Sequence, residues 1–211
     1  MVGMCIRFWP EYRHALECIR SGKAGRVRSA MFKRISPNVD GSGWQNWFMK
    51  ADLSGGALLD LHLHDVDFLR HLMGMPKAVT SFGLSGFRSD HGIDQVMTRY
   101  DYGDDTLVTI EGGWSPPQGT PFEMSFQILC ERMTFRFAAD GYSVVHEDGA
   151  VETPQPADPA RPTGWHVEID YLLRCLREKT APDMPLDEVV EAIRITEAEA
   201  ESIRTGKTVT L

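Results

Sequence analysis

The stretch SGGALLDLHLHDVDFLRHLMG, residues 54–74, decides how this chain can fold. Apolar side chains recur through it at helical spacing, Ser54 can cap a helix start, and Gly74 followed by Pro76 is a typical stop. The pattern predicts one continuous helix from Ser54 to Met73. Because the stretch contains no Lys or Glu, we expect most of its circumference to be buried.

Four titratable residues of this stretch, Asp60, His64, Asp67 and His71, share one side of the predicted helix, because they are spaced by four, three and four residues. A buried charge needs a partner, and a solvated helix face would usually carry Lys and Glu. We therefore interpret the stripe as the wall of a functional cleft, with Asp67 as a candidate substrate contact. His71, near the helix end, is better explained by a favourable interaction with the helix dipole.

Asp60 and His64 are the candidate catalytic pair. Imidazole is the side chain best suited to proton transfer near neutral pH. A carboxylate one turn earlier can orient the ring and favour its protonated form. The pair suits removal of a hydroxyl proton while a hydride leaves the same carbon, and it suits other proton transfers equally well.

A metal site is the competing interpretation of the same residues. His62 and His64, with Asp65 and Asp67, resemble an H-x-H-x-D cluster of metal-dependent hydrolases. On a strand the two imidazoles would share a face, whereas on a helix they point roughly 200° apart. The apolar flanks favour the helix, so the hydrolase is the lesser alternative. His62 is then predicted to be a packed or surface residue.

The rest of the chain predicts an α+β fold, with a large open, mostly antiparallel sheet and helices packed on one face. Predicted strands cover 2–8, 26–35, 208–211 and a meander from 77 to about 153; predicted helices cover 11–21, 164–179 and 185–205. Residues 36–52 form an aromatic loop that contains Trp44 and Trp47. Residues 154–162 hold four prolines and are predicted to be an extended linker.

Composition restricts the class of protein. The chain has 211 residues and a net charge of −8, which argues against a surface for nucleic acid or anionic membranes. Its four cysteines are scattered without metal-ligand spacing, which fits a reduced, cytoplasmic protein. The sequence shows no signal peptide and no apolar run of about 20 residues, the length needed to span a bilayer.

A known family signature matches these residues. Gly55 to Asp60 and then His64 to Asp67 resemble the G-G-x-L-x-D-x-x-x-H-D-x-D motif of the glucose–fructose oxidoreductase/inositol dehydrogenase (Gfo/Idh/MocA) family. Arg7-Phe8-Trp9-Pro10 resembles the family's entry into its second domain, and residues 22–27 resemble its turn into the first sheet strand. Weaker similarities to the closing helices extend the resemblance over nearly the whole chain.

The resemblance implies a fold, an activity and a cofactor. Family members carry an N-terminal Rossmann domain and a C-terminal α+β domain of the GAPDH type, whose open sheet commonly forms homo-oligomers. In its dehydrogenases the residue at Asp60 orients the one at His64, which is the acid–base group on a sugar or polyol hydroxyl. NAD or NADP is the cofactor of the complete enzyme.

The sequence also departs from the family. It contains no G-x-G-x-x-G, so we expect this chain alone to bind no dinucleotide. Residues 1–10 would be a remnant of the last Rossmann strand and its linker, and 11–211 a single α+β domain. Without its neighbours the strand at 2–8 is expected to pair with another copy, fold back on its own sheet, or be disordered. The chain is then expected to be a truncated product, a natural stand-alone domain, or half of a split enzyme whose partner is a separate Rossmann-domain chain.

Two functions therefore compete with the hydrolase alternative. The first is the substrate half of an oxidoreductase, with Asp60 and His64 as acid–base pair and Lys33 and Trp44 as further substrate contacts. Lys33 lies on a predicted strand that could face the same cleft, although a surface lysine is the better interpretation. The second is a non-catalytic module that oligomerises or binds sugar.

Overall fold

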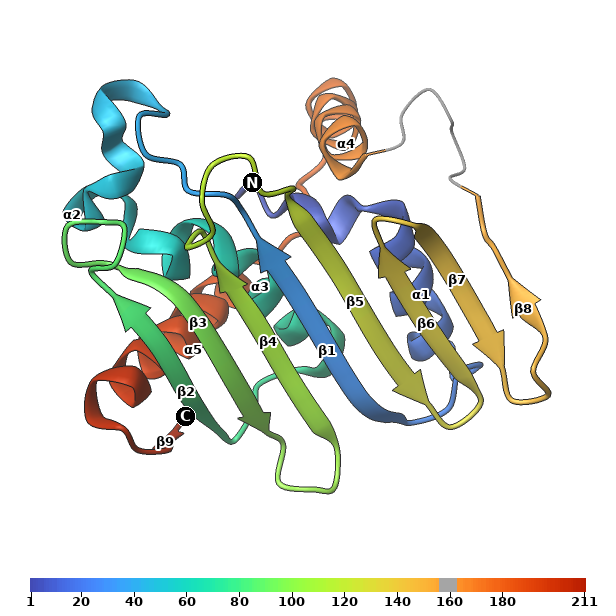
Figure 1. Ribbon diagram of the computed structural model, residues 1–211. Helices are drawn as coiled ribbons and strands as arrows, with labels where there is room; N and C mark the ends of the chain where they lie inside the picture. Colours follow the sequence, from blue (N-terminus) through green and yellow to red (C-terminus); the bar gives the residue numbers. More distant parts are fainter. Residues whose placement is uncertain (156–162) are drawn as a thin grey trace.

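A computed structural model gives the fold (Figure 1) and describes residues 1–155 and 163–211. The predicted linker at 154–162 lies mostly outside the described residues. Among the described residues, no helix is both long and apolar enough to cross a membrane.

A nine-stranded sheet dominates the molecule, in the order β8-β7-β6-β5-β1-β4-β3-β2-β9. The strands are β1 Val27–Ile35, β2 Ala78–Ser85, β3 Ile93–Asp101, β4 Leu107–Gly113, β5 Glu123–Cys130, β6 Met133–Ala138, β7 Gly141–His146, β8 Val151–Glu152 and β9 Val209–Thr210. β1 and β4 are parallel, and the other neighbours are antiparallel. The predicted α+β fold with a mostly antiparallel open sheet is confirmed.

The helices are α1 Pro10–Arg20, α2 Ala51–Ser54, α3 Leu63–Met73, α4 Gly164–Glu178 and α5 Leu186–Thr205, with 3₁₀ helices η1 Cys5–Phe8 and η2 Trp44–Met49 and a π-helix η3 Leu58–His62. Figure 1 shows α1, α3 and α5 behind the sheet, whose front face no helix covers. One face of the sheet is therefore packed and the other is open, as predicted.

The core lies between the sheet and the helices behind it. The Tyr12 ring from α1 packs edge-on against Phe68 of α3, with ring centroids 4.8 Å apart, and against Phe126 of β5 at 4.6 Å. Phe32 of β1 and Phe135 of β6 are fully buried in the same cluster. Each such ring contributes about 2–3 kcal/mol through burial, so this cluster fixes α1 and α3 on the sheet.

The predicted helix from Ser54 to Met73 is wrong at its start and right beyond it, because the chain is helical without a break from Gly56 to Met73, through η3 and α3. α2 ends at Ser54, and Gly55 and Gly56 both adopt positive φ angles, 76° and 71°. Glycines reach this left-handed region easily, whereas other residues are strained there. Ser54 does not cap a helix start; its Oγ accepts a hydrogen bond from the Gly56 backbone N–H at 3.0 Å and so stabilises the break.

The predicted strand at 2–8 is also wrong, because residues 5–8 form η1. Met4 and Ile6 are buried, and Met4 packs with Met184 and Val189 from the α5 region. The apolar run thus gains its burial by packing on helices instead of pairing in a sheet. None of the three fates expected for a lone strand describes it.

Candidate functional site

The candidate catalytic residues lie on two consecutive helical pieces. Asp60 belongs to the π-helix η3, and His64 to the first turn of α3. π-Helical turns are rare and frequently mark functional sites. η3 rests closely on β4, because a Cβ at Gly112 would come within 2.6 Å of His62 Nδ1. This close approach fixes where the helix carries Asp60 and His64.

His64 is a half-buried imidazole without a partner on one nitrogen. Its Nδ1 is buried and has no hydrogen-bond partner. Burial lowers the His64 pKa, and the nearby Arg34 guanidinium lowers it further. A neutral imidazole near pH 7 can accept a proton, so His64 has the protonation state that a general base needs.

Asp60 is half-buried, and burial raises the pKa of its carboxyl. Among the described residues, the Asp60 side chain forms no hydrogen bond or ion pair with the His64 ring or with any other group. The two residues are one turn apart in the chain, as the sequence predicts. The pairing of Asp60 with His64 therefore stays a prediction.

Two buried arginine–aspartate pairs flank His64. The sequence analysis did not predict their arginines, Arg34 and Arg7. Arg34 Nε donates to Asp65 Oδ2 at 2.7 Å, with Nη2 at 3.3 Å from Oδ1. Arg7 donates through Nε and Nη2 to both oxygens of Asp67, at 2.7 and 2.6 Å. Both aspartates are fully buried. Strand alternation was an available signal, since it places Arg34 on the same face as Phe32.

Two of the remaining predicted contacts, Lys33 and Asp67, are held in ion pairs. Lys33 lies between two inward residues of β1, so it projects from the open face, where its Nζ is 3.1 Å from Glu123 Oε2. Trp44 of η2 is 76% exposed. Asp67 forms a buried ion pair with Arg7. The stripe therefore divides, with Asp60 and His64 in one part and Asp67 and His71 in an ionic network in the other.

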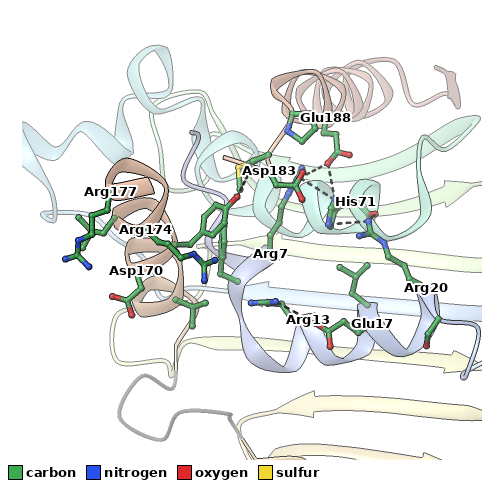
Figure 2. A pocket seen from close by; sticks show the side chains of 18 residues that line it. Arg7, Arg13, Glu17, Arg20, His71, Asp170, Arg174, Arg177, Asp183 and Glu188 are labelled. Atoms are coloured by element: carbon green, nitrogen blue, oxygen red, sulfur yellow. Dashed lines mark hydrogen bonds and ion pairs between the residues drawn. The ribbon is translucent and has the colours of Figure 1, made fainter. Parts of the chain in front are cut away.

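A groove of about 1230 Å³ lies between α1, α4 and the start of α5 (Figure 2). His71 lines it, together with Arg7, Arg20 and Glu188, but Asp60 and His64 do not. His71 donates through Nδ1 to Glu188 Oε2 at 3.0 Å, and Arg20 donates to the His71 carbonyl at 2.8 Å. His71 therefore belongs to this groove and its ion pairs, which the sequence did not predict.

The described residues fit neither a metal ion nor a dinucleotide. No group of three His, Cys, Asp or Glu among them could hold a metal. His62 is fully buried and its Nε2 lies 3.2 Å from Glu199 Oε1, so it is a packed histidine. A dinucleotide needs a strand, a glycine-rich turn and a helix N-terminus for its pyrophosphate, and the described sheet and helices contain no such unit.

Comparison with known proteins fits this architecture. A family model described as the GFO/IDH/MocA C-terminal domain matches residues 12–136. The chain belongs to the GFO/IDH/MocA family. The predicted resemblance is thereby confirmed, and so is the assignment to the family's C-terminal domain.

Individual relatives of this GFO/IDH/MocA domain are enzymes of sugars or polyols. The chain is 28% identical over 124 residues to the 2,7-anhydro-N-acetylneuraminate hydratase of Escherichia coli (strain K12), covering 54% of this chain and 31% of that protein. It is 25% identical over 203 residues to scyllo-inositol 2-dehydrogenase (NADP(+)) IolW of Bacillus subtilis (strain 168), covering 85% and 55%.

Among solved structures, a levoglucosan dehydrogenase in complex with NADH and levoglucosan superposes with a TM-score of 0.81 at 19% identity, covering 100% of this chain and 65% of that one. This likeness shows the fold. The chain spans less than two thirds of the length of each of these three proteins.

Proposed function

We propose that this chain is the substrate-binding domain of an oxidoreductase that acts on a sugar or polyol hydroxyl, with His64 as the acid–base group and Asp60 as its partner. The observation that carries the proposal is the His64 imidazole, which is half-buried, neutral near pH 7 and without a partner on its buried Nδ1. The sugar and polyol enzymes among its relatives support the substrate class.

The chemistry assigned to this chain is proton transfer. His64 accepts the proton of the substrate hydroxyl, and Asp60 stabilises the resulting imidazolium. The oxidation also requires an acceptor for a hydride, and the described residues offer no dinucleotide site. We therefore propose that NAD or NADP comes with a dinucleotide-binding domain, in the same protein or in a separate chain.

Of the other predicted contacts, Trp44 stays in the proposal, because an exposed aromatic ring can stack on a sugar. Lys33 and Asp67 do not, because ion pairs with Glu123 and Arg7 occupy them.

We also propose that the open face of the sheet pairs with a second copy, since it exposes Met31, Phe82, Met97 and Leu107. The four free cysteines support a cytoplasmic setting.

The proposal is tested by polyol binding to the purified chain, measured by calorimetry with scyllo-inositol and levoglucosan. His64→Gln should weaken binding about tenfold, the effect of losing one hydrogen bond. His91→Gln is the matched control, since His91 is an exposed histidine paired with Asp52. NADH fluorescence should show no binding to the chain alone.

The outcomes separate the candidate functions. Binding that is weakened by His64→Gln and unchanged by His91→Gln supports the acid–base site. Polyol binding that both variants retain would instead favour a non-catalytic sugar-binding module. Stoichiometric zinc in the purified protein would favour the hydrolase.

A further inference from the structure

A buried polar network holds the far side of the helix that carries the candidate site. The His62 imidazole, at the end of η3, lies with its Nε2 3.2 Å from Glu199 Oε1 of α5 and 3.3 Å from the Tyr100 hydroxyl of β3. The Tyr100 hydroxyl donates to the same Glu199 oxygen. All three side chains are buried. The network therefore ties η3 to the sheet and to α5, two elements that lie far from it in the chain.

The network satisfies only part of its polar atoms. Glu199 Oε2 and His62 Nδ1 are buried and have no hydrogen-bond partner among the described residues. A buried polar network with unpaired atoms stabilises a fold no more than apolar side chains of similar volume would. Apolar packing would therefore hold η3 in place at least as well. The network adds direction, because a hydrogen bond requires a defined geometry between its donor and its acceptor.

Direction matters at this point of the chain because η3 is a π-helix. The i→i+5 hydrogen bonds of a π-helix interrupt the α-helical spacing, so the direction of the following side chains depends on how this turn is held. Asp60 and His64 stand two residues before and after His62, on roughly the opposite side of the helix. The His62 ring packs closely on Gly112, where a Cβ would come within 2.6 Å of Nδ1. A rotation that moved His62 would turn Asp60 and His64 with it.

We propose that Glu199 is a positioning residue of the candidate site, which holds His62 and thereby sets the rotation of η3 and the direction of Asp60 and His64. Glu199 lies 137 positions after His62 in the chain and acts through it. The Tyr100 hydroxyl supports the pair as a second donor. The effect of Glu199 on polyol binding rests on the proposed function, whereas its effect on the orientation of His64 rests on the contacts alone.

The test follows the NMR signals of the His64 imidazole in the free protein, together with calorimetry of scyllo-inositol binding to the full chain. Glu199→Leu removes the acceptor of His62, so it should shift the His64 signals and weaken polyol binding about tenfold. Glu199→Gln keeps a side-chain carbonyl oxygen that can accept from His62. This conservative variant should recover the His64 signals and the affinity of the wild type.

Ser202→Ala is the matched control on the same helix. Ser202 is buried one turn after Glu199, accepts a hydrogen bond from the Ser81 backbone N–H at 2.9 Å and donates to the Lys207 carbonyl at 2.6 Å. Its loss should lower the urea midpoint of unfolding. Because Ser202 is not part of the network that holds His62, the variant should leave the His64 signals unchanged.

A fully apolar version separates positioning from stability. His62→Leu, Tyr100→Phe and Glu199→Leu together remove every polar side-chain group of the network, so the urea midpoint should be no lower than that of the wild type. The His64 signals and the polyol affinity should nevertheless change as they do in Glu199→Leu. This triple variant keeps the proposal testable if Glu199→Leu alone does not fold, because it leaves no buried polar atom of the network unpaired.

The outcomes distinguish this proposal from the proposed function. Wild-type His64 signals in the triple variant overturn the positioning role, even if polyol binding shows that the proposed function holds. Equal shifts of the His64 signals in Glu199→Leu and Ser202→Ala overturn it as well, because they would be a general effect of lost stability. If the wild type binds no polyol, the proposed function fails, but His64 signals that move in Glu199→Leu and recover in Glu199→Gln still support the positioning role.

Discussion

At the scale of single residues, the surroundings shift two titratable side chains in ways that can be measured. Burial and Arg34 lower the His64 pKa, so the ring is neutral near pH 7. For Glu188, burial alone would raise the pKa, but hydrogen bonds from His71 and Arg7 outweigh it and lower the pKa to about 2. His64 is therefore prepared to take up a proton, whereas Glu188 is held ionised by its contacts with Arg7 and His71.

Glu188→Gln should lower the free energy of unfolding by about 2–3 kcal/mol at neutral pH. Because the folded-state pKa lies below the unfolded value of 4.5, this stability is present above about pH 4.5 and is lost as the pH falls towards 2. Urea unfolding at a series of pH values measures the effect, with Glu201→Gln of the exposed Arg204 pair as control. A variant curve parallel to that of the wild type over this range would contradict the assignment.

Arg34 should control the titration of His64. Arg34→Gln removes a cation that lowers the His64 pKa and should raise that pKa, whereas Asp65→Asn removes an anion that raises it and should lower it. Arg34→Lys keeps the charge and should restore the wild-type value. NMR titration of the imidazole gives the pKa directly. Shifts of the same sign in Arg34→Gln and Asp65→Asn would show that charge is not the cause.

At the scale of elements, local patterns predicted the parts whose structure is set locally. The meander strands and the two closing helices follow from alternation, turn glycines and apolar periodicity, and they appear near the expected bounds. The turn at Gly55 and Gly56, which separates α2 from the long helix, was not predicted, because it depends on a Ser54 hydrogen bond that apolar periodicity does not reveal. η1 was missed because it packs mainly against α4, far along the chain.

The candidate site was predictable only in part for the same reason. Asp60 and His64 follow from helical spacing within one segment. The Arg34–Asp65 pair joins residues 31 positions apart, and it depends on how α3 packs on β1. Lys33 was assigned to the cleft because the sequence does not show which face of its strand meets that helix.

Gly112→Ala tests the close contact between η3 and β4. The new Cβ would lie 2.6 Å from His62 Nδ1 and 2.9 Å from His62 Cβ, so the helix must shift, at a cost of about 1–3 kcal/mol. Gly3→Ala is the control, since its Cβ would meet nothing closer than 3.9 Å. The two unfolding free energies are compared by urea denaturation. Equal values for both variants would mean that η3 does not rest on β4 as described.

At the scale of the whole molecule, the open sheet face is an apolar surface that no described helix covers. Figure 1 shows it without a covering helix, and Met31 and Met97, in the middle of β1 and β3, are 54% and 55% exposed. Exposed apolar patches of this kind mark interaction sites. Two copies meeting through this face would bury it by a symmetric contact.

Sedimentation of the wild type should therefore show a concentration-dependent oligomer, and Met97→Glu should yield monomers, because two charges would meet across the symmetric contact. Leu53→Ser is the control, since Leu53 is 64% exposed but lies in α2, off the sheet. Monomeric wild-type protein at high concentration would contradict the proposed pairing.

The protonation of His64 is the most direct measure of the proposed chemistry. NMR titration of its imidazole should give a pKa below the ordinary value of 6.5 in the free protein. Saturating scyllo-inositol or levoglucosan should then shift the His64 signals and its pKa while leaving those of the exposed His91 unmoved. A His64 pKa at its ordinary value, with signals that neither polyol changes, would contradict an acid–base role for this residue.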